Sequence, residues 1–178
     1  RNLIDILSNV QFHTNWMRHF GPLSGSDPKL QKPVERYLLT LFTYGCNLGP
    51  AQAARHMRGI ISAHMLSFVN RRHINEEKLN LALVDLLNNY HLFRLPKFCV
   101  DGKRAAADGT KYDLSEQNLM AEYHIRYGGY GGIAYHHVSD LYVALFSHFI
   151  NCGTWEAVYI IDGLLKNDSE IQPNTLHA

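Results

Sequence analysis

The stretch Arg104-Ala-Ala-Ala-Asp-Gly-Thr-Lys-Tyr-Asp113 decides how the rest of this sequence is interpreted. It predicts a strand of small residues that carries Asp108 at its lip, with a glycine directly after the aspartate. The sequence before this strand predicts helices, and most of the sequence after it predicts a sheet built beside the strand. Hard cations such as Mg²⁺ bind carboxylate and phosphate oxygens, so an aspartate in this position is typical of the first ligand in a metal-dependent nuclease or phosphotransferase. Spacing alone supplies only this one carboxylate.

The composition indicates a globular protein of one domain or two small ones, because 46% of the 178 residues are hydrophobic and 19% are charged. Lys and Arg number 17 and Asp and Glu 16, so the net charge of +1 does not indicate a nucleic-acid partner. No apolar run is long enough to span a bilayer. We expect a cytoplasmic protein with reduced thiols rather than disulfides or zinc, since the cysteines are odd in number and far apart: Cys46, Cys99 and Cys152.

The two ends of the sequence predict a fragment of a longer protein. The first residue is Arg1 rather than methionine. The last residues, Thr175-Leu-His-Ala178, have the pattern of a strand that stops midway.

Residues 1–95 predict an all-helical scaffold region. Apolar spacing predicts a first helix from Leu3 through Trp16 and a second that is closed by Gly45, with an apolar stripe of Val34, Tyr37, Leu38, Leu41 and Phe42. Pro50 begins a short helix in the expected way, with proline at the first helical position. Asn75 caps a later helix whose predicted apolar face is Leu79, Leu83, Leu86, Leu87 and Tyr90.

Two short helices in this region, residues 52–57 and 64–72, are spaced like a helix-turn-helix. Arg71 and Arg72 lie where such a module would meet phosphates. A plain helical pair with a solvated basic end explains the same residues and is the more common arrangement. The pattern favours the plain pair and leaves a non-catalytic DNA-binding module open.

Beyond Leu95-Pro96 the helical pattern ends, and residues 96–178 predict a second region. Phe98–Val100 is predicted to be extended, and Asp101-Gly102 is predicted to turn before the strand of Asp108. Around this strand the sequence has five positive residues and two negative ones. Such a cluster can neutralise phosphates beside a metal site, but it is more commonly a solvated loop face. The positive residues are Arg94, Lys97, Lys103, Arg104 and Lys111.

Two further patterns in the second region are assigned to local structure. Asp113 and Glu116 fit an N-cap and its reciprocal partner for a helical turn through Met120. The glycines of Tyr127-Gly-Gly-Tyr-Gly-Gly132 predict a flexible or tightly turning loop beside Arg126. Nucleotide binding is excluded here, because the loop has neither the lysine nor the hydroxyl of a phosphate-binding loop.

Residues 133–150 predict two antiparallel strands joined by a turn at Asp140. His136 and His137 are neighbours on one strand, so they point to opposite faces and cannot both bind one metal. A helix capped by Thr154 follows, and its predicted buried face is Trp155, Val158, Ile161 and Leu165.

The order of elements from residue 103 predicts an α+β fold. Strand, insertion, strand, strand, helix and strand follow one another, and the last strand starts at Thr175. A meander of three antiparallel strands with a helical crossover to a fourth is the first half of a ribonuclease H-like mixed sheet. In that arrangement the fourth strand lies next to the first, so a carboxylate just past Ala178 would come close to Asp108.

Long motifs from both regions carry a family resemblance. The motifs are Tyr44-Gly-Cys-Asn-Leu-Gly49, Ala107-Asp-Gly-Thr-Lys-Tyr-Asp-Leu114, Glu116-Gln-Asn-Leu119, Tyr123-His-Ile-Arg-Tyr-Gly-Gly-Tyr-Gly-Gly132, Tyr135-His-His-Val-Ser-Asp140 and Trp155-Glu-Ala-Val-Tyr-Ile-Ile-Asp-Gly-Leu-Leu165. Together they resemble the catalytic domain of the Tn-three family of replicative, cointegrate-forming bacterial transposases. The resemblance covers essentially the whole chain.

The resemblance implies a DDE transposase, in which two aspartates and a glutamate on a ribonuclease H-like fold hold Mg²⁺ or Mn²⁺. Asp108 matches the first aspartate, and Asp101, in a similar Asp-Gly pair, is the fallback. The second aspartate is expected directly after Ala178 and the glutamate further downstream. Residues 1–178 alone are therefore predicted to be inactive.

The implied reaction cleaves transposon 3′ ends and joins them to target DNA, with one metal ion activating the nucleophile and the other stabilising the leaving oxygen. The implied partners are terminal repeats and target DNA, with a homodimer as the active complex. Charge alone selects the residues expected to contact the DNA backbone near the site: Lys103, Arg104, Lys111 and Arg126. Two alternatives stay open, the helix-turn-helix-like module and an inactive transposon remnant with an unpaired sheet edge.

Overall fold

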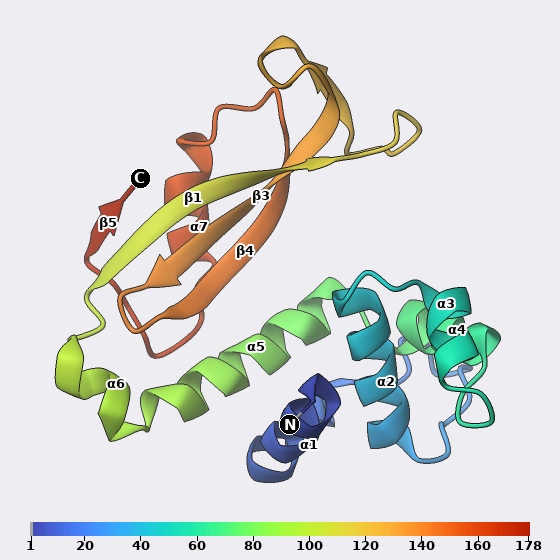
Figure 1. Cartoon of the computed structure of the whole chain (residues 1–178). Coiled ribbons are helices and arrows are strands. Elements are labelled where there is room, and N and C mark those ends of the chain that lie inside the picture. Colours follow the sequence, from blue (N-terminus) through green and yellow to red (C-terminus); the bar gives the residue numbers. More distant parts are fainter. Residues whose placement is uncertain (1) are drawn as a thin grey trace. The chain divides into compact units, whose positions relative to one another are not determined.

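The computed structural model describes residues 2–178, apart from the side chain of Cys99. The chain divides into two compact units, one up to Leu86 and one over Leu87–Ala178. The first unit is helical and the second is built on a mixed sheet, so the predicted α+β class is confirmed (Figure 1). No helix in the part of the chain that the structure describes is long and apolar enough to cross a membrane.

The helical unit has capped helices where the sequence predicts them. Its elements are α1 (Leu3–Thr14), a 3₁₀ turn (Trp16–His19), α2 (Pro33–Gly45), α3 (Pro50–His56), α4 (Ala63–His73) and the first part of α5 (Glu76–His91). The Ser62 hydroxyl accepts from the Met65 N–H at 3.2 Å at the start of α4. The Asn75 side chain accepts from the Lys78 N–H at 3.0 Å, which confirms the predicted cap of α5.

The first helix ends earlier than predicted. Asn15 adopts a left-handed backbone with a φ of 51°, and its N–H donates to the Gln11 carbonyl, so α1 closes at Thr14. The Gln11 side chain accepts from the Met17 N–H at 2.8 Å, which starts a separate 3₁₀ turn. The prediction of one helix through Trp16 is wrong, because asparagine tolerates the left-handed conformation without interrupting the apolar spacing.

The core of the helical unit includes side chains from α2 and α4. Leu66 and Val69 of α4 are fully buried, and the predicted stripe of α2 is confirmed as buried at Tyr37 and Leu38. Val34, near the start of α2, is exposed instead. The Tyr37 hydroxyl lies 3.0 Å from Nδ1 of buried His73, which satisfies two polar groups inside the core.

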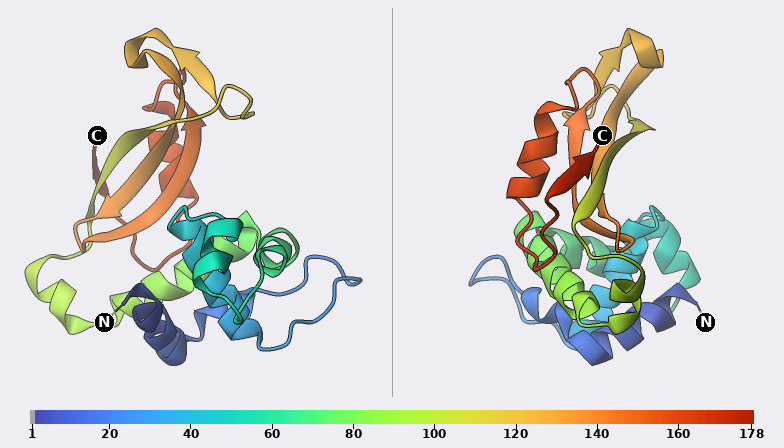
Figure 2. Two further views of the ribbon diagram at one scale, coloured as in Figure 1. Left: turned by 45° about the vertical axis from the view of Figure 1, so that its right-hand side comes forward. Right: turned by 90° about the vertical axis from the view of Figure 1, so that its left-hand side faces the viewer.

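The sheet unit is organised around β1 (Arg104–Asp113), with α7 on one face of the sheet (Figure 2). β1 pairs antiparallel with β3 (Gly129–Ser139) along one edge and parallel with β5 (Thr175–His177) along the other. β3 also pairs antiparallel with β4 (Val143–Asn151) and with β2 (Glu122–His124). The predicted order is confirmed for β1, β3, β4 and β5, as is the pairing of the last strand with the first, whereas β2 lies in the segment predicted to be an insertion.

Two predictions of local structure beside β1 are wrong. Residues 98–100 are not a separate extended piece, because α6 (Arg94–Cys99) is helical. Pro96 occupies the first turn of α6, where a missing N–H costs no helical hydrogen bond. The helical turn predicted after Asp113 is absent from the described residues, since that carboxylate accepts from Lys111 Nζ at 2.5 Å and turns follow it.

The glycine-rich stretch is mostly strand rather than loop. Gly128 turns the chain with a φ of 68°, and the glycines that follow it lie in β3. A Cβ at Gly132 would lie 2.2 Å from a ring carbon of Phe149 on β4, and one at Gly131 would lie 2.7 Å from the Tyr112 carbonyl. These glycines therefore permit close strand packing, which a count of glycines does not distinguish from flexibility.

α7 (Val158–Leu165) packs on the sheet through a different face from the one predicted. Gly163 lies against the ring of His137, and Tyr159 and Ile160 pack against the core beside it. The four residues predicted to be buried are exposed: Trp155, Val158, Ile161 and Leu165. The predicted Thr154 cap is also wrong, because Ala157 precedes the helix and no side chain caps it. The glycine lets α7 approach a buried histidine ring, and this contact turns the apolar stripe outward.

Candidate functional site

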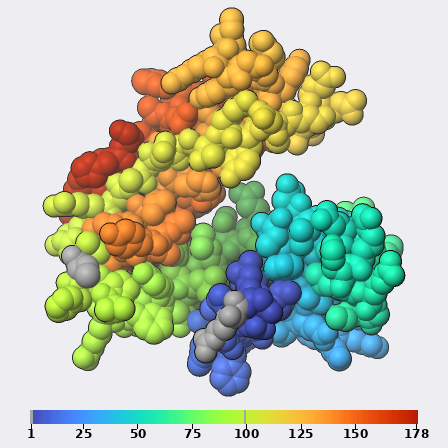
Figure 3. Space-filling model, in the orientation of Figure 1, coloured from blue at the N-terminus to red at the C-terminus, as the bar shows by residue number. Residues whose placement is uncertain are grey.

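Asp108 lies near the middle of β1 on the face of the sheet that α7 does not cover, which is called the open face below. Side chains alternate along a strand, and β1 follows this rule: Ala105 and Ala107 are buried, whereas Asp108 is exposed. Ala107 packs in the same cluster as Tyr159 and Ile160 of α7. Figure 3 shows β1 uncovered at the surface of the sheet unit. The structure therefore presents Asp108 to solvent from a rigid strand.

A polar row crosses the open face at the level of Asp108. The Gly109 N–H donates to Asp108 Oδ1 at 2.8 Å. His136 is directly across on β3, and its Nδ1 lies 2.7 Å from the Ser147 hydroxyl on β4. Among the described residues no hydrogen bond joins Asp108 to His136.

Glu156, which is not among the predicted site residues, lies against the other face of β1. A Cβ at Gly109 would lie 2.5 Å from Glu156 Oε2 and 2.7 Å from Cγ2 of buried Ile133, so the close packing favours glycine there. Gly109 shares the α7 side of the strand with Ala107, and Glu156 therefore lies on the side opposite to Asp108. Burial raises the pKa of nearby Tyr135, and the carboxylates of Glu156 and Asp108 raise it further. The glycine directly after the aspartate is the sequence signal for this close approach.

The first two residues predicted to contact DNA, Lys103 and Arg104, lie at the start of β1. Lys103 Nζ is 3.8 Å from Asp101 Oδ2 in an exposed ion pair. Arg104 is four residues before Asp108, so it shares the open face at a spacing of about 13 Å along the strand. Of the four predicted contacts, Arg104 is the one on β1 that the structure places on the face of Asp108.

The other two residues predicted to contact DNA gather around Tyr127. Lys111 Nζ and the Arg126 guanidinium lie 5.9 and 5.8 Å from the centroid of the Tyr127 ring. Lys111 also forms the ion pair with Asp113. Because Lys111 is an odd number of residues from Asp108, it projects from the opposite face of β1. The structure thus divides the four predicted residues between two places.

The described residues do not complete a metal centre. Asp108 is the predicted ligand, and its carboxylate oxygens suit Mg²⁺ or Mn²⁺. Asp101, the fallback, accepts from the Lys103 N–H at 3.2 Å in the turn before the strand. Within residues 2–178 no group of three or more His, Cys, Asp or Glu side chains is placed to hold a metal ion. One carboxylate fits the chemistry, but it is not a site by itself.

Two histidines on the α7 side of the sheet have a structural role. His137 is fully buried and its Nε2 donates to the Ile160 carbonyl at 3.1 Å, so His136 and His137 point to opposite faces as predicted. His148 Nδ1 is 3.6 Å from Asp162 Oδ2 on α7. Burial lowers the pKa of both His137 and His148 and so favours their neutral forms under the helix. They hold α7 against the sheet.

The comparisons with known proteins agree along the length of the chain. A family model described as the Tn3 transposase DDE domain matches residues 5–178. The transposase for transposon Tn1546 of Enterococcus faecium is 25% identical over 170 residues, that for Tn501 of Pseudomonas aeruginosa 27% over 175, and that for gamma-delta of Escherichia coli K12 23% over 174. These alignments cover 95%, 96% and 97% of this chain and 17% of each relative. No solved structure matches the chain.

Proposed function

This chain belongs to the family of Tn3 transposase DDE domains, and on that premise we propose that it forms the first part of the catalytic domain of a DNA transposase. The proposed reaction is cleavage of transposon 3′ ends and transfer of those ends to target DNA in replicative transposition. The family match over residues 5–178 and the relatives named as transposases support the reaction class. Residues 1–95 are proposed as a helical scaffold and residues 96–178 as the N-terminal half of the catalytic domain.

The sheet is proposed to be the first half of a ribonuclease H-like fold. Three antiparallel strands, β1, β3 and β4, are followed by α7 and then by β5, which runs parallel to β1. This gives the central strand order β4, β3, β1, β5. A meander joined to a parallel strand through a helix supports the assignment.

The register of β5 against β1 is the observation that carries the proposal. Ala106 is paired with His177, after Arg104 with Thr175 and Ala105 with Leu176. In a parallel ladder each step along one strand is matched by one step along the other. A strand continuing two residues beyond His177 would therefore place its second residue opposite Asp108. A carboxylate at that position would complete a pair on the open face.

Asp108 is proposed to supply one carboxylate to a divalent cation, Mg²⁺ or Mn²⁺, which when bound supplies Lewis-acid stabilisation of phosphate charge. No catalytic step is assigned through the ion, because residues 2–178 do not complete its site. The part of this chain is to hold the Asp108 oxygens on a rigid strand and to hold DNA phosphates. Basic residues proposed for those phosphates are Lys103, Arg104, Lys111 and Arg126. A homodimer acting in the cytoplasm stays a prediction.

The proposal is tested by replacing Asp108 in the full-length transposase. Asp108→Asn keeps the shape of the side chain and removes its charge. We expect nicking of a transposon-end duplex in Mg²⁺ to fall by roughly 100-fold or more, the loss typical when a charge-stabilising group is removed. Binding of the same duplex should stay unchanged. Glu170→Gln, which neutralises an exposed carboxylate in the same unit, is the matched control and should nick normally.

Normal nicking by Asp108→Asn would show that the assignment is wrong. Loss of nicking in Asp101→Asn instead would move the ligand to the fallback position. The 178-residue chain by itself is proposed to be inactive, and Mg²⁺-dependent nicking by the purified chain would contradict this.

A further inference from the structure

Charge is distributed unevenly along the helical unit. From Arg36 to Asn75 the sequence contains five arginines and no aspartate or glutamate, although the whole chain carries a net charge of only +1. Four of these arginines belong to α3, α4 and the loop between them: Arg55, Arg58, Arg71 and Arg72. A segment with one sign of charge creates a local potential that net charge does not reveal.

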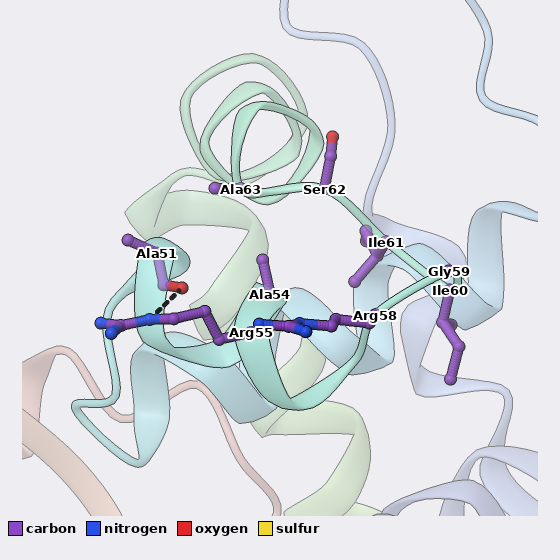
Figure 4. A pocket seen from close by; sticks show the side chains of 9 residues that line it. All are labelled: Ala51, Ala54, Arg55, Arg58, Gly59, Ile60, Ile61, Ser62 and Ala63. Atoms are coloured by element: carbon purple, nitrogen blue, oxygen red, sulfur yellow. Dashed lines mark hydrogen bonds between the residues drawn. The ribbon is translucent and has the colours of Figure 1, made fainter.

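Two of these arginines line a hollow of about 520 Å³ between α3 and the start of α4. We call it the arginine hollow, and its lining residues are Ala51, Ala54, Arg55, Arg58, Gly59, Ile60, Ile61, Ser62 and Ala63. Figure 4 shows Arg55 and Arg58 along the same side of the hollow, across from Ser62 and Ala63. Arg55 Nε donates to the Ala51 carbonyl at 3.4 Å, which holds its guanidinium along α3. Both arginines are exposed.

No carboxylate among the described residues pairs with Arg55 or Arg58, in contrast to the other basic hollow of this unit. That second hollow is lined by Asp27, His64, Phe68, Arg71 and Arg72. There Arg72 lies 3.8 Å from Asp27, so one of its two arginines is already compensated. The arginine hollow therefore has the greater uncompensated positive charge of the two.

We propose that the arginine hollow binds the phosphate backbone of double-stranded DNA, as a contact additional to any made by the residues around Asp108. Arginine presents a planar fork of donors that matches phosphate oxygens. The rest of the lining is mostly small, with Ala51, Ala54 and Gly59 among its residues, so a backbone can approach the guanidinium groups closely. This contact would position the duplex without reading its sequence.

The lining favours a duplex over other acidic partners. It contains no aromatic side chain, whereas single-stranded nucleic acid is bound by stacking bases on aromatic rings. Aromatic anchors are also enriched at the energetic centres of protein interfaces, and the hollow offers none. The proposal rests on the DNA substrate of the proposed function. Because DNA binding and nicking are measured in separate assays, the arginine hollow and the role of Asp108 can be refuted independently.

The test measures binding of the 178-residue chain to a fluorescein-labelled duplex of about 30 bp, three helical turns, by fluorescence anisotropy at several salt concentrations. Each phosphate contact adds about 0.9 to the salt slope, so Arg55→Ala/Arg58→Ala should lower the slope by about 1.8 and raise Kd roughly 60-fold at 0.1 M salt. Arg55→Lys/Arg58→Lys keeps the charge and should retain most of the binding. Thermal melting shows that each variant is folded.

The matched control is Lys32→Ala/Lys166→Ala, which also removes two positive charges. Lys32 precedes α2 and lies 3.5 Å from Glu35 of that helix, and Lys166 follows α7 and lies 2.7 Å from Asp162 of that helix. Neither lysine lines the arginine hollow. A Kd close to wild type in this control and a large loss in the arginine variant would support the proposal. Equal losses in both variants, an unchanged Kd in the arginine variant, or competition by poly-glutamate as strong as by unlabelled duplex would overturn it.

Discussion

Gly163 tests whether α7 is held on the sheet as the structure shows. Glycine inside a helix normally costs about 1 kcal/mol relative to alanine, so Gly163→Ala would stabilise an isolated helix. In this structure, however, the new Cβ would lie 2.2 Å from Cε1 of His137 and 2.6 Å from both ring nitrogens. Ordinary carbon contacts are about 3.5–4.0 Å, so the shortfall exceeds about 1 Å.

The His137 ring cannot easily retreat from that methyl group. It is fully buried, and its Nε2 donates to the Ile160 carbonyl at 3.1 Å. Overpacking of this kind costs about 1–3 kcal/mol, and loss of the hydrogen bond would add about 1 kcal/mol. Against a gain of about 1 kcal/mol in helix propensity, we expect a net loss of about 2 kcal/mol in the free energy of unfolding. The corresponding fall in Tm is about 8–16 °C for a unit of this size.

The assay is urea and thermal unfolding of the whole chain followed by circular dichroism. Gly45→Ala is the matched control, because Gly45 also lies in a helix and a Cβ there meets nothing within 4 Å. That control should be neutral or slightly stabilising. In a His137→Ala background the space beside the helix is open, so Gly163→Ala should lose its penalty. The reasoning is refuted if Gly163→Ala stabilises the chain as much as the control does.

Two further predictions concern groups whose environment the structure defines. Burial lowers the pKa of His137 and His148, so in the folded state these two rings stay neutral at pH values where they are protonated in the unfolded chain. Their contribution to the free energy of unfolding should be complete above about pH 6.5 and fall as the pH drops below it. NMR titration midpoints of these rings at or above 6.5 would contradict this. Asn75→Ala should cost about 1 kcal/mol by removing the cap that accepts from the Lys78 N–H, whereas Asn75→Asp should melt near wild type, and equal melting of the two variants would show that the cap contributes nothing.

Local signals predicted most of what positions Asp108. The small residues of β1 predict its strand, and the hairpin between β3 and β4 follows from alternation and the turn at Asp140. Alternation along β1 by itself puts Arg104 and Lys111 on opposite faces of the strand, whereas a prediction from charge alone groups them together. The basic residues near Asp108 are thus divided between the two faces of β1, which a count of nearby charges does not reveal.

The elements that the sequence predicted wrongly depend on choices that are not local. Apolar spacing predicts one buried stripe for α7. The other face is buried instead, because Gly163 packs against the ring of His137, which lies 26 positions earlier in the chain. Pro96 suggests the end of a helix but falls in the first turn of α6, where proline is tolerated. Asp113 has the sequence of an N-cap, and its ion pair with Lys111 competes for that carboxylate.

The position opposite Asp108 is fixed by the segment before β5 rather than by β5 itself. β5 makes only three ladder pairs, and a slip of one residue in so short a strand would turn each side chain to the other face. Two features oppose that slip. The N–H groups of Asn174 and Thr175 both donate to the Lys103 carbonyl, at 2.8 and 3.1 Å. Upstream, Ile171 is buried and its carbonyl accepts from the Asn167 side chain at 2.7 Å.

These anchors connect the buried turn after α7 to the ladder beside Asp108. Because Ile171 packs with Ala105 in one core cluster, the start of β5 is tied to the start of β1. The pairing of Thr175 with Arg104 then sets the alignment of every later residue in the ladder. Substitution at Asn167 should therefore reduce nicking by the full-length transposase, although Asn167 is not a predicted metal ligand. A register held in this way would bring a carboxylate two residues beyond His177 opposite Asp108, although β3, β4 and α7 lie between the two strands in the chain.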